Sequence, residues 1–308
     1  MKKLKGIKAV ITDADNTLYS WIDYIVPSLE ALTETLHRIT GFSREAIVES
    51  MKKVFTAYNT NEYAFVLQEA DIFEGMRRKD FRWFQTHVVD PARYSFNRAR
   101  KSNLRVYPGV HKTLQILCSR GIRVIGLSDA PCFPAEQRIK HLGVDRYLHA
   151  LYALKSYPVP RHGELDGEIV NRIRVGYYKS LIEKVVELPL SFEKPSTRGI
   201  ARILEDERLK LERVLIIGDS LKKDIRIAQE MGIADVWARY GTVISTEMRD
   251  KLSFYSAPAI QRRNVSQPGD ASYTPTWTVD RFDQLLDIIE LPPFAPGGRD
   301  VCPSPQPA

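Results

Sequence analysis

The segment AVITDADNTLY, residues 9–19, constrains this chain most, because an apolar run ends there in acids. The run from Ile7 to Ile11 is typical of a strand that is buried on both faces. Side chains at positions i and i+2 of an extended backbone point the same way, so Asp13 and Asp15 can face one point. Two acids at the end of a buried strand are costly unless a metal ion, a lysine or both compensate their charge. Taken alone, such a pair is more typical of a turn cap.

Two later apolar strands, predicted at Arg123–Leu127 and Arg213–Ile217, also end in polar groups. These groups are Ser128, Asp129, Asp219 and Asp224. In an open parallel sheet, ligands bind at the carboxyl ends of the strands, and all of these groups follow such ends. Lys194, just before a predicted helix, supplies a cation to the same edge. The ordered set therefore predicts one acidic site that contains a lysine.

Residues 18–103 show helical periodicity and no convincing strand pattern. Apolar residues recur at helical spacing through 25–39, and Ser43 is a candidate N-cap for the next helix. Further helices are expected at 64–73, 79–89 and 92–100. The segment is predicted to be a separate helical domain, inserted directly after the acidic motif.

From residue 104 to residue 292 strands alternate with helices, which predicts right-handed crossovers and a parallel sheet. Together with residues 1–17 this segment predicts an α/β fold, a Rossmann-like parallel sheet with helices on both faces. Glu193-Lys194-Pro195 is expected to open a helix. Three other stretches are harder to interpret. Residues 178–186 are expected as a helix, 241–272 as an irregular loop and the proline-rich tail 293–308 as disordered.

At this point the sequence resembles the haloacid dehalogenase superfamily, whose members are mostly phosphatases. The matching motifs are Asp13-Ala14-Asp15-Asn16-Thr17-Leu18, Ser128, Lys194 before Pro195, and Gly218-Asp219-Ser220 through Asp224. The resemblance covers residues 7–154 and 194–290, and it implies that the helical insertion is a cap that closes over the site. Asn16 departs from the pattern, because many members carry glycine there. Asparagine tolerates a similar turn backbone.

The resemblance implies a role for each matching residue. Asp13 would attack phosphorus to form an aspartyl-phosphate, and Asp15 would act first as general acid and then as general base. Ser128 would donate a hydrogen bond to a phosphoryl oxygen. Lys194 would neutralise charge on the phosphoryl group and on Asp13. The implied ligands of a Mg²⁺ ion are the Asp13 carboxylate, the Asp15 carbonyl, Asp219 and, directly or from an outer position, Asp224.

The expected activity is Mg²⁺-dependent hydrolysis of a small phosphorylated metabolite. The segment Asp15–Tyr19 also resembles pyrimidine nucleotidases, so a nucleoside monophosphate is one candidate substrate. Dehalogenases of this superfamily lack the second aspartate and need no metal, so Asp15 disfavours carbon–halogen cleavage. Two alternatives stay open: a phosphotransferase or mutase, and a non-catalytic protein of the same fold that binds nucleic acid or another protein.

Composition limits the expected partners. The net charge of +7 favours anionic ligands, but the chain lacks the aromatic-interleaved basic runs of nucleic-acid strand binding, so nucleic acid is not expected. Nine basic and four acidic residues fall between Asp71 and Arg105, and they form either an anion-attracting surface or an ordinary solvated face. No apolar stretch approaches the ~18 residues of a membrane span. Three scattered cysteines fit a reducing, cytoplasmic setting. The oligomeric state is open.

Overall fold

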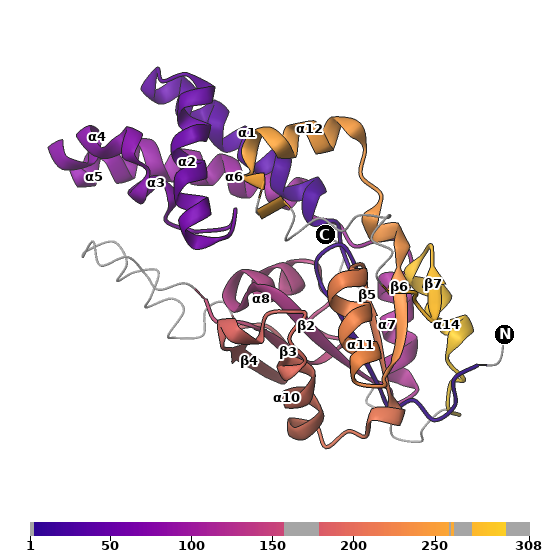
Figure 1. The fold of residues 1–308 in the computed structure, drawn as a ribbon. Helices are drawn as coiled ribbons and strands as arrows, with labels where there is room; N and C mark the ends of the chain where they lie inside the picture. Colours follow the sequence, from indigo (N-terminus) through magenta and orange to yellow (C-terminus); the bar gives the residue numbers. More distant parts are fainter. Residues whose placement is uncertain (1–2, 157–178, 259, 262–272, 294–308) are drawn as a thin grey trace.

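In the computed structural model the described residues are 3–156, 179–258, 260–261 and 273–293. They contain a seven-stranded sheet, parallel throughout, with strand order β4-β3-β2-β1-β5-β6-β7. The strands are β1 (Ala9–Thr12), β2 (Arg123–Pro131), β3 (Leu148–Leu154), β4 (Lys184–Leu188), β5 (Val214–Gly218), β6 (Ala234–Ala238) and β7 (Trp277–Val279). Because β1 is central, the residues that follow it are flanked by other strand ends on both sides (Figure 1).

Alternate residues of the central strands point into two different cores. Val10 belongs to a core that includes residues of α7 (Val110–Ser119), α8 (Cys132–His141) and α14 (Leu285–Ile288). Ile11 belongs to a second core, with residues of α10 (Arg198–Asp206) and α11 (Arg226–Glu230). Helices therefore cover both faces of the sheet, and the predicted Rossmann-like α/β fold is confirmed.

Between β1 and β2 the chain forms the helical insertion, defined here as residues 21–103. Its elements are α1 (Trp21–Thr40), α2 (Arg44–Tyr58), α3 (Val66–Glu69), η1 (Asp71–Phe73), α4 (Glu74–Lys79), α5 (Phe81–Phe84), η2 (Gln85–Val89) and α6 (Asp90–Asn103). The expected N-cap Ser43 is present, since its side chain accepts a hydrogen bond from the Ala46 amide. In Figure 1 the insertion lies above the sheet domain, and α1 packs along α6.

The remaining short helical turns lie in the connections of the sheet domain. They are η3 (Leu190–Phe192), η4 (Leu211–Arg213), η5 (Leu221–Ile225), η6 (Arg239–Thr242) and η7 (Phe282–Gln284). Within the part of the chain that the structure describes, no helix is long and apolar enough to cross a membrane.

The expected irregular loop at 241–272 is wrong in part, because it contains α12 (Thr246–Tyr255). This helix leaves the sheet domain after β6 and packs against α1 and α2 of the insertion (Figure 1). Leu252 is 2% exposed and shares a core with residues of α1. The apolar side of α12 is too small to predict a helix by itself, and packing against α1 supplies the missing stabilisation.

Two further expectations are wrong. Residues 184–186, expected as the end of a helix over 178–186, instead belong to the edge strand β4 (Lys184–Leu188), whose central valines suit a strand. The helix expected at Lys194-Pro195 begins only at Arg198, so Lys194 lies in the preceding loop. Three long stretches lie outside the described residues: 157–178, most of 259–272 and the tail 294–308.

Candidate active site

The carboxyl end of β1 places Asp13 at the centre of the sheet edge, where it is 8% exposed. Its amide donates to the Ile217 carbonyl of β5 (2.9 Å), so the strand pairing continues as far as the acid. Thr17 Oγ1 donates to Asp13 Oδ2 (3.3 Å). The chain then turns at Asn16, whose φ of 58° is left-handed, a conformation that asparagine tolerates. Asn16 Oδ1 accepts from the Trp21 amide (3.0 Å) at the start of α1.

Lys194 reaches the same point from the loop before α10. Its Nζ lies 2.5 Å from Asp13 Oδ1 and 2.7 Å from Asp224 Oδ1, and the residue is 4% exposed. Gly218, at the end of β5, makes room for the second of these acids. A Cβ at Gly218 would lie 2.2 Å from Asp224 Cγ, so only glycine allows this close approach.

Three carboxylates converge beside this lysine. Asp13, Asp219 and Asp224 are all buried, and each has an oxygen within 4.8 Å of an oxygen of the other two. Carboxylate oxygens are the ligands that Mg²⁺ prefers. Three buried carboxylates against the single Lys194 ammonium leave an excess of negative charge, which is costly unless a further cation balances it. The residues therefore fit a divalent cation.

The pKa values of the acids at this edge are shifted in different directions. Burial raises the pKa of Asp13 to about 7, with Lys194 opposing the shift and Asp224 adding to it. Burial also raises the pKa of Asp15, although Arg138 opposes that shift. For Asp129 the Lys223 and Lys194 ammonium groups outweigh burial, and its pKa lies below its usual value. Relative to a solvated aspartate, the protonated form is thus favoured at Asp15 and the ionised form at Asp129.

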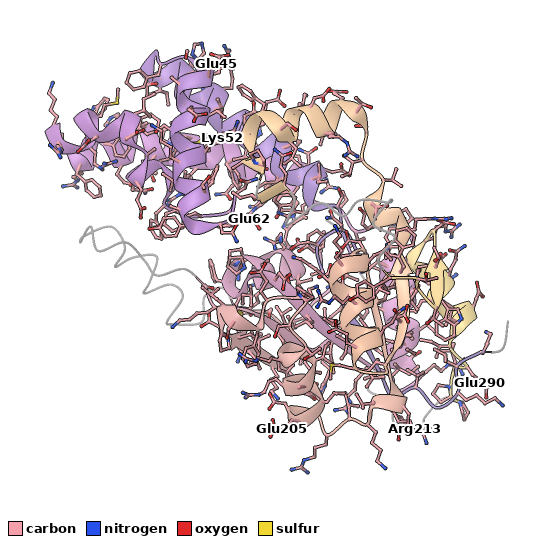
Figure 2. All side chains as sticks on the ribbon, in the orientation of Figure 1. Glu45, Lys52, Glu62, Glu205, Arg213 and Glu290 are labelled. Atoms are coloured by element: carbon pink, nitrogen blue, oxygen red, sulfur yellow. The ribbon has the colours of Figure 1, made fainter. Side chains whose placement is uncertain are left out.

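A cavity of about 60 Å³ lies among these groups and between the sheet edge and the helical insertion. Its lining from the sheet domain and the β1 loop is Asp13, Asp15, Asn16, Asp129, Ala130, Pro131, Lys194, Asp219, Ser220, Lys223 and Asp224. Trp21, Thr60 and Glu62 of the insertion complete it. Figure 2 shows Glu62 on the side of the insertion that faces the sheet domain.

The structure thus brings together Asp13, Asp15, Lys194, Asp219 and Asp224, the residues expected to form one site. Ser128 is placed differently. It is buried beside the cavity without lining it, and its Oγ accepts a hydrogen bond from the Ala130 amide (3.1 Å). Its neighbour Asp129 does line the cavity and accepts from the Lys194 amide (2.9 Å) and from Lys223 Nζ (2.8 Å).

None of the nine basic residues between Asp71 and Arg105 is among the described residues that line the cavity. Arg78, for example, pairs with Glu74 one turn away, and its side chain is 79% exposed. This placement favours the solvated-face alternative for the basic segment.

Three residues at or beside the site were not predicted to belong to it. Lys223, on η5, falls inside the motif from Gly218 to Asp224, whereas Glu62, between α2 and α3, and Arg138, on α8, lie outside the motifs. Arg138 Nη2 lies 3.3 Å from Asp15 Oδ2. Sequence reasoning missed these residues because single charged residues on helices and loops are usually solvated.

A parallel sheet that gathers buried acids and two lysines, Lys194 and Lys223, at the carboxyl ends of its strands, beneath a helical insertion, is typical of a class of Rossmann-like α/β hydrolases. The chain belongs to the haloacid dehalogenase-like hydrolase family, whose model matches residues 7–174. A second model, described as HAD-hydrolase-like, matches residues 191–284. The predicted superfamily and the prediction of an enzyme are confirmed.

Known proteins share this architecture at low identity. A curated protein named glyceraldehyde 3-phosphate phosphatase, from Methanopyrus kandleri, is 20% identical over 293 residues, covering 92% of this chain and 97% of that protein. The crystal structure of a HAD phosphatase from Thermococcus onnurineus superposes with a TM-score of 0.52 and 15% identity, covering 93% and 99% of the two chains. A HAD hydrolase from Bacillus subtilis, bound to magnesium, gives a TM-score of 0.49 and 14% identity, covering 92% and 99%.

Proposed function

We propose that this enzyme hydrolyses a small phosphate monoester with Asp13 as the nucleophile. The observation that carries the proposal is the position of the Asp13 carboxylate, which lies at the cavity with Oδ1 held 2.5 Å from Lys194 Nζ. An Asp13 oxygen attacks phosphorus, the bond from phosphorus to the substrate oxygen breaks, and an aspartyl-phosphate forms. The Lys194 ammonium offsets the negative charge that builds up on the phosphoryl oxygens.

Asp15 is proposed to move the protons. Its raised pKa favours the protonated form, which donates its proton to the departing substrate oxygen. The resulting carboxylate then takes a proton from water as that water attacks phosphorus. The second displacement releases inorganic phosphate and restores Asp13 and protonated Asp15.

The metal in this proposal is Mg²⁺, held by the Asp13 and Asp219 carboxylates and the Asp15 carbonyl, with Asp224 as a further acidic support. When bound, Mg²⁺ would polarise the phosphoryl oxygens and neutralise part of their charge. Asp224 also holds Lys194 (2.7 Å), and its Oδ2 accepts from the Ser220 amide (3.2 Å), so it fixes the lysine as well as the cluster.

The helical insertion is proposed to act as a cap that contacts the leaving group. Trp21, Thr60 and Glu62 of the insertion line the cavity opposite the acids, so they are the side chains placed to select the substrate. The similarity to a protein named glyceraldehyde 3-phosphate phosphatase supports a triose phosphate as the first substrate to test.

The test is phosphate release from triose phosphates, other sugar phosphates and nucleoside monophosphates, in Mg²⁺ and in EDTA, by wild type and Asp13→Asn. We expect Mg²⁺-dependent release from a narrow set of esters that is lost in the variant. Transfer of phosphate to a sugar acceptor in preference to water would favour the phosphotransferase alternative. No release from any ester would refute the proposal.

A further inference from the structure

Arg138 is the largest of the fully buried side chains, with 1% exposure, and it lies on α8 of the sheet domain. Each nitrogen of its guanidinium has its own partner. Nε donates to the Tyr19 hydroxyl (2.8 Å), Nη2 lies 3.3 Å from Asp15 Oδ2, and Nη1 pairs with Glu62 Oε1. A buried charge with three directed contacts is costly to build and has few alternative geometries.

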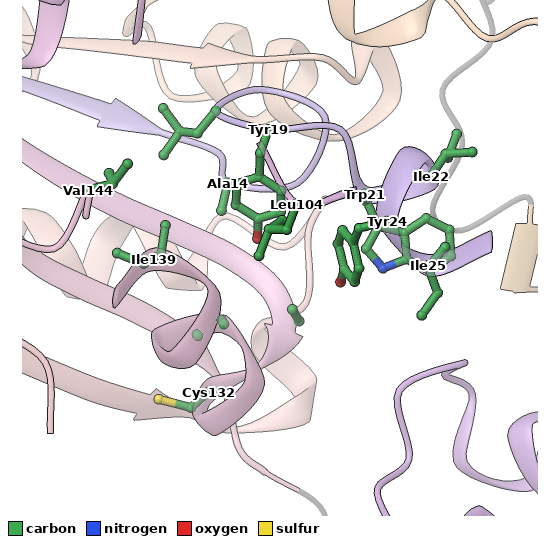
Figure 3. Close-up of a cluster of buried hydrophobic side chains, with 14 of the residues drawn as sticks. Ala14, Tyr19, Trp21, Ile22, Tyr24, Ile25, Leu104, Cys132, Ile139 and Val144 are labelled. Atoms are coloured by element: carbon green, nitrogen blue, oxygen red, sulfur yellow. The ribbon is translucent and has the colours of Figure 1, made fainter. Parts of the chain in front are cut away.

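Glu62 brings the helical insertion to this arginine. Its Oε1 also accepts from the Tyr24 hydroxyl (2.7 Å), and its Oε2 from Trp21 Nε1 (3.4 Å). Tyr24 and Trp21 lie on the first turns of α1, beside Tyr19 of the β1 loop (Figure 3). The Arg138 guanidinium lies 5.7 Å from the ring centroids of both Tyr19 and Tyr24. The insertion thus holds the Glu62 carboxylate by two hydrogen bonds in addition to its contact with Arg138.

The two oxygens of Asp15 have different surroundings. Oδ2 faces Arg138, whereas Oδ1 is buried and has no hydrogen-bond partner among the described residues. Asp15 also lines the cavity. The orientation of the Asp15 carboxyl group at the cavity therefore depends on how Oδ2 is held.

On the basis of the function proposed above, we propose that Arg138 is a positioning residue that couples the seating of the helical insertion to the orientation of Asp15. Glu62 docks on Arg138 only when the insertion lies against the sheet domain. Arg138 then holds Asp15 Oδ2 and so orients the Asp15 carboxyl group toward the leaving oxygen. We call Asp15, Arg138 and Glu62 the arginine bridge.

A planar guanidinium can meet two carboxylates and a hydroxyl at once, whereas a lysine ammonium is a single point of charge. Arg138→Met removes the bridge. Glu62→Gln keeps the size and the accepting oxygen of residue 62 but removes its charge, so it tests the bridge with less disturbance of the fold. Arg123→Met is the matched control, because it breaks another arginine–carboxylate pair, with Glu207 (3.2 Å), at the start of β2 and away from the cavity.

The experiment compares two esters that differ in their need for a proton. An alkyl phosphate such as a triose phosphate needs a proton from Asp15 for its leaving oxygen, whereas p-nitrophenyl phosphate releases a stable nitrophenolate without one. With the alkyl ester we expect kcat to fall roughly tenfold in Glu62→Gln and on the order of a hundredfold in Arg138→Met. With p-nitrophenyl phosphate the first step should survive while Asp15-assisted hydrolysis of the aspartyl-phosphate slows. Rapid mixing should then show a nitrophenolate burst of about one equivalent per enzyme.

Equal losses with both esters and no burst would overturn the arginine bridge, because a general structural defect slows both steps. Wild-type kinetics in both variants would also overturn it. Arg123→Met should keep the wild-type kcat. If Arg138→Met does not fold, Glu62→Gln alone decides by the same criteria. A wild-type enzyme that releases phosphate from neither of these esters nor from any ester of the panel above would refute the proposed function, and the bridge with it. An active wild type with unaffected variants would refute the bridge alone.

Discussion

Replacing Lys194 with methionine tests the electrostatics of the site most directly. The side chain is 3% exposed, and its Nζ contacts Asp13 Oδ1 at 2.5 Å and Asp224 Oδ1 at 2.7 Å. Methionine preserves most of the buried volume but leaves these carboxylates without their cation. Removing one partner of a buried ion pair costs roughly 3–5 kcal/mol. We therefore expect the free energy of unfolding to fall by about that amount in EDTA.

The loss of unfolding free energy in Lys194→Met should grow with pH. Burial already raises the pKa of Asp13 to about 7 in the folded protein, against 3.8 ordinarily, so this group's contribution to stability falls as pH rises from about 4 to about 7. Lys194 opposes that shift, and without it the pKa of Asp13 rises further. At pH 5 Asp13 is largely protonated with or without the lysine, so the variant should lose less there than at pH 8.

The assay is urea unfolding, followed by tryptophan fluorescence in EDTA at pH 5 and pH 8. Lys53→Met is the control, because Lys53 forms a pair of similar length with Asp71 (2.7 Å) while both side chains are more than half exposed. Exposed pairs contribute little, so the control should unfold at nearly the wild-type urea concentration. A loss below about 1 kcal/mol in Lys194→Met, or an equal loss at both pH values, would refute the reasoning.

Three further outcomes are expected. Saturating Mg²⁺ should raise the melting temperature. At a hundredfold excess over Kd the free energy of unfolding should increase by about 2.7 kcal/mol, and Asp219→Asn should abolish this increase. An unchanged increase in Asp219→Asn would exclude Asp219 as a ligand. Leu252→Ala should lower the free energy of unfolding in urea by about 2–5 kcal/mol. Phe254→Ala should lower it much less, because Phe254 is 38% exposed. Equal small losses would mean that α12 does not pack on the insertion. Gly218→Ala should lower phosphatase activity and cost about 1–3 kcal/mol, because its Cβ would displace Asp224; wild-type kinetics would contradict the packing.

Local patterns in the sequence determine much of this protein. A strand that ends in acids, followed by strands that alternate with helices, is sufficient to predict the parallel sheet and the edge at which Asp13, Asp219 and Lys194 meet. The N-cap Ser43 and the turn at Asn16 are equally local, because each depends on the conformation of one or two neighbouring residues.

Only the tertiary structure decides the features that depend on distant partners. The helix α12 was missed because its apolar side is small, and its stability comes from α1, more than two hundred residues earlier. The arginine bridge joins Arg138 to Asp15 and Glu62, which are 123 and 76 residues away in the chain. A charged residue on a helix is normally solvated, and its neighbours in the sequence do not reveal that it will be buried between two carboxylates. Local sequence thus defines the acidic edge, whereas the contacts that orient Asp15 exist only once the chain has folded.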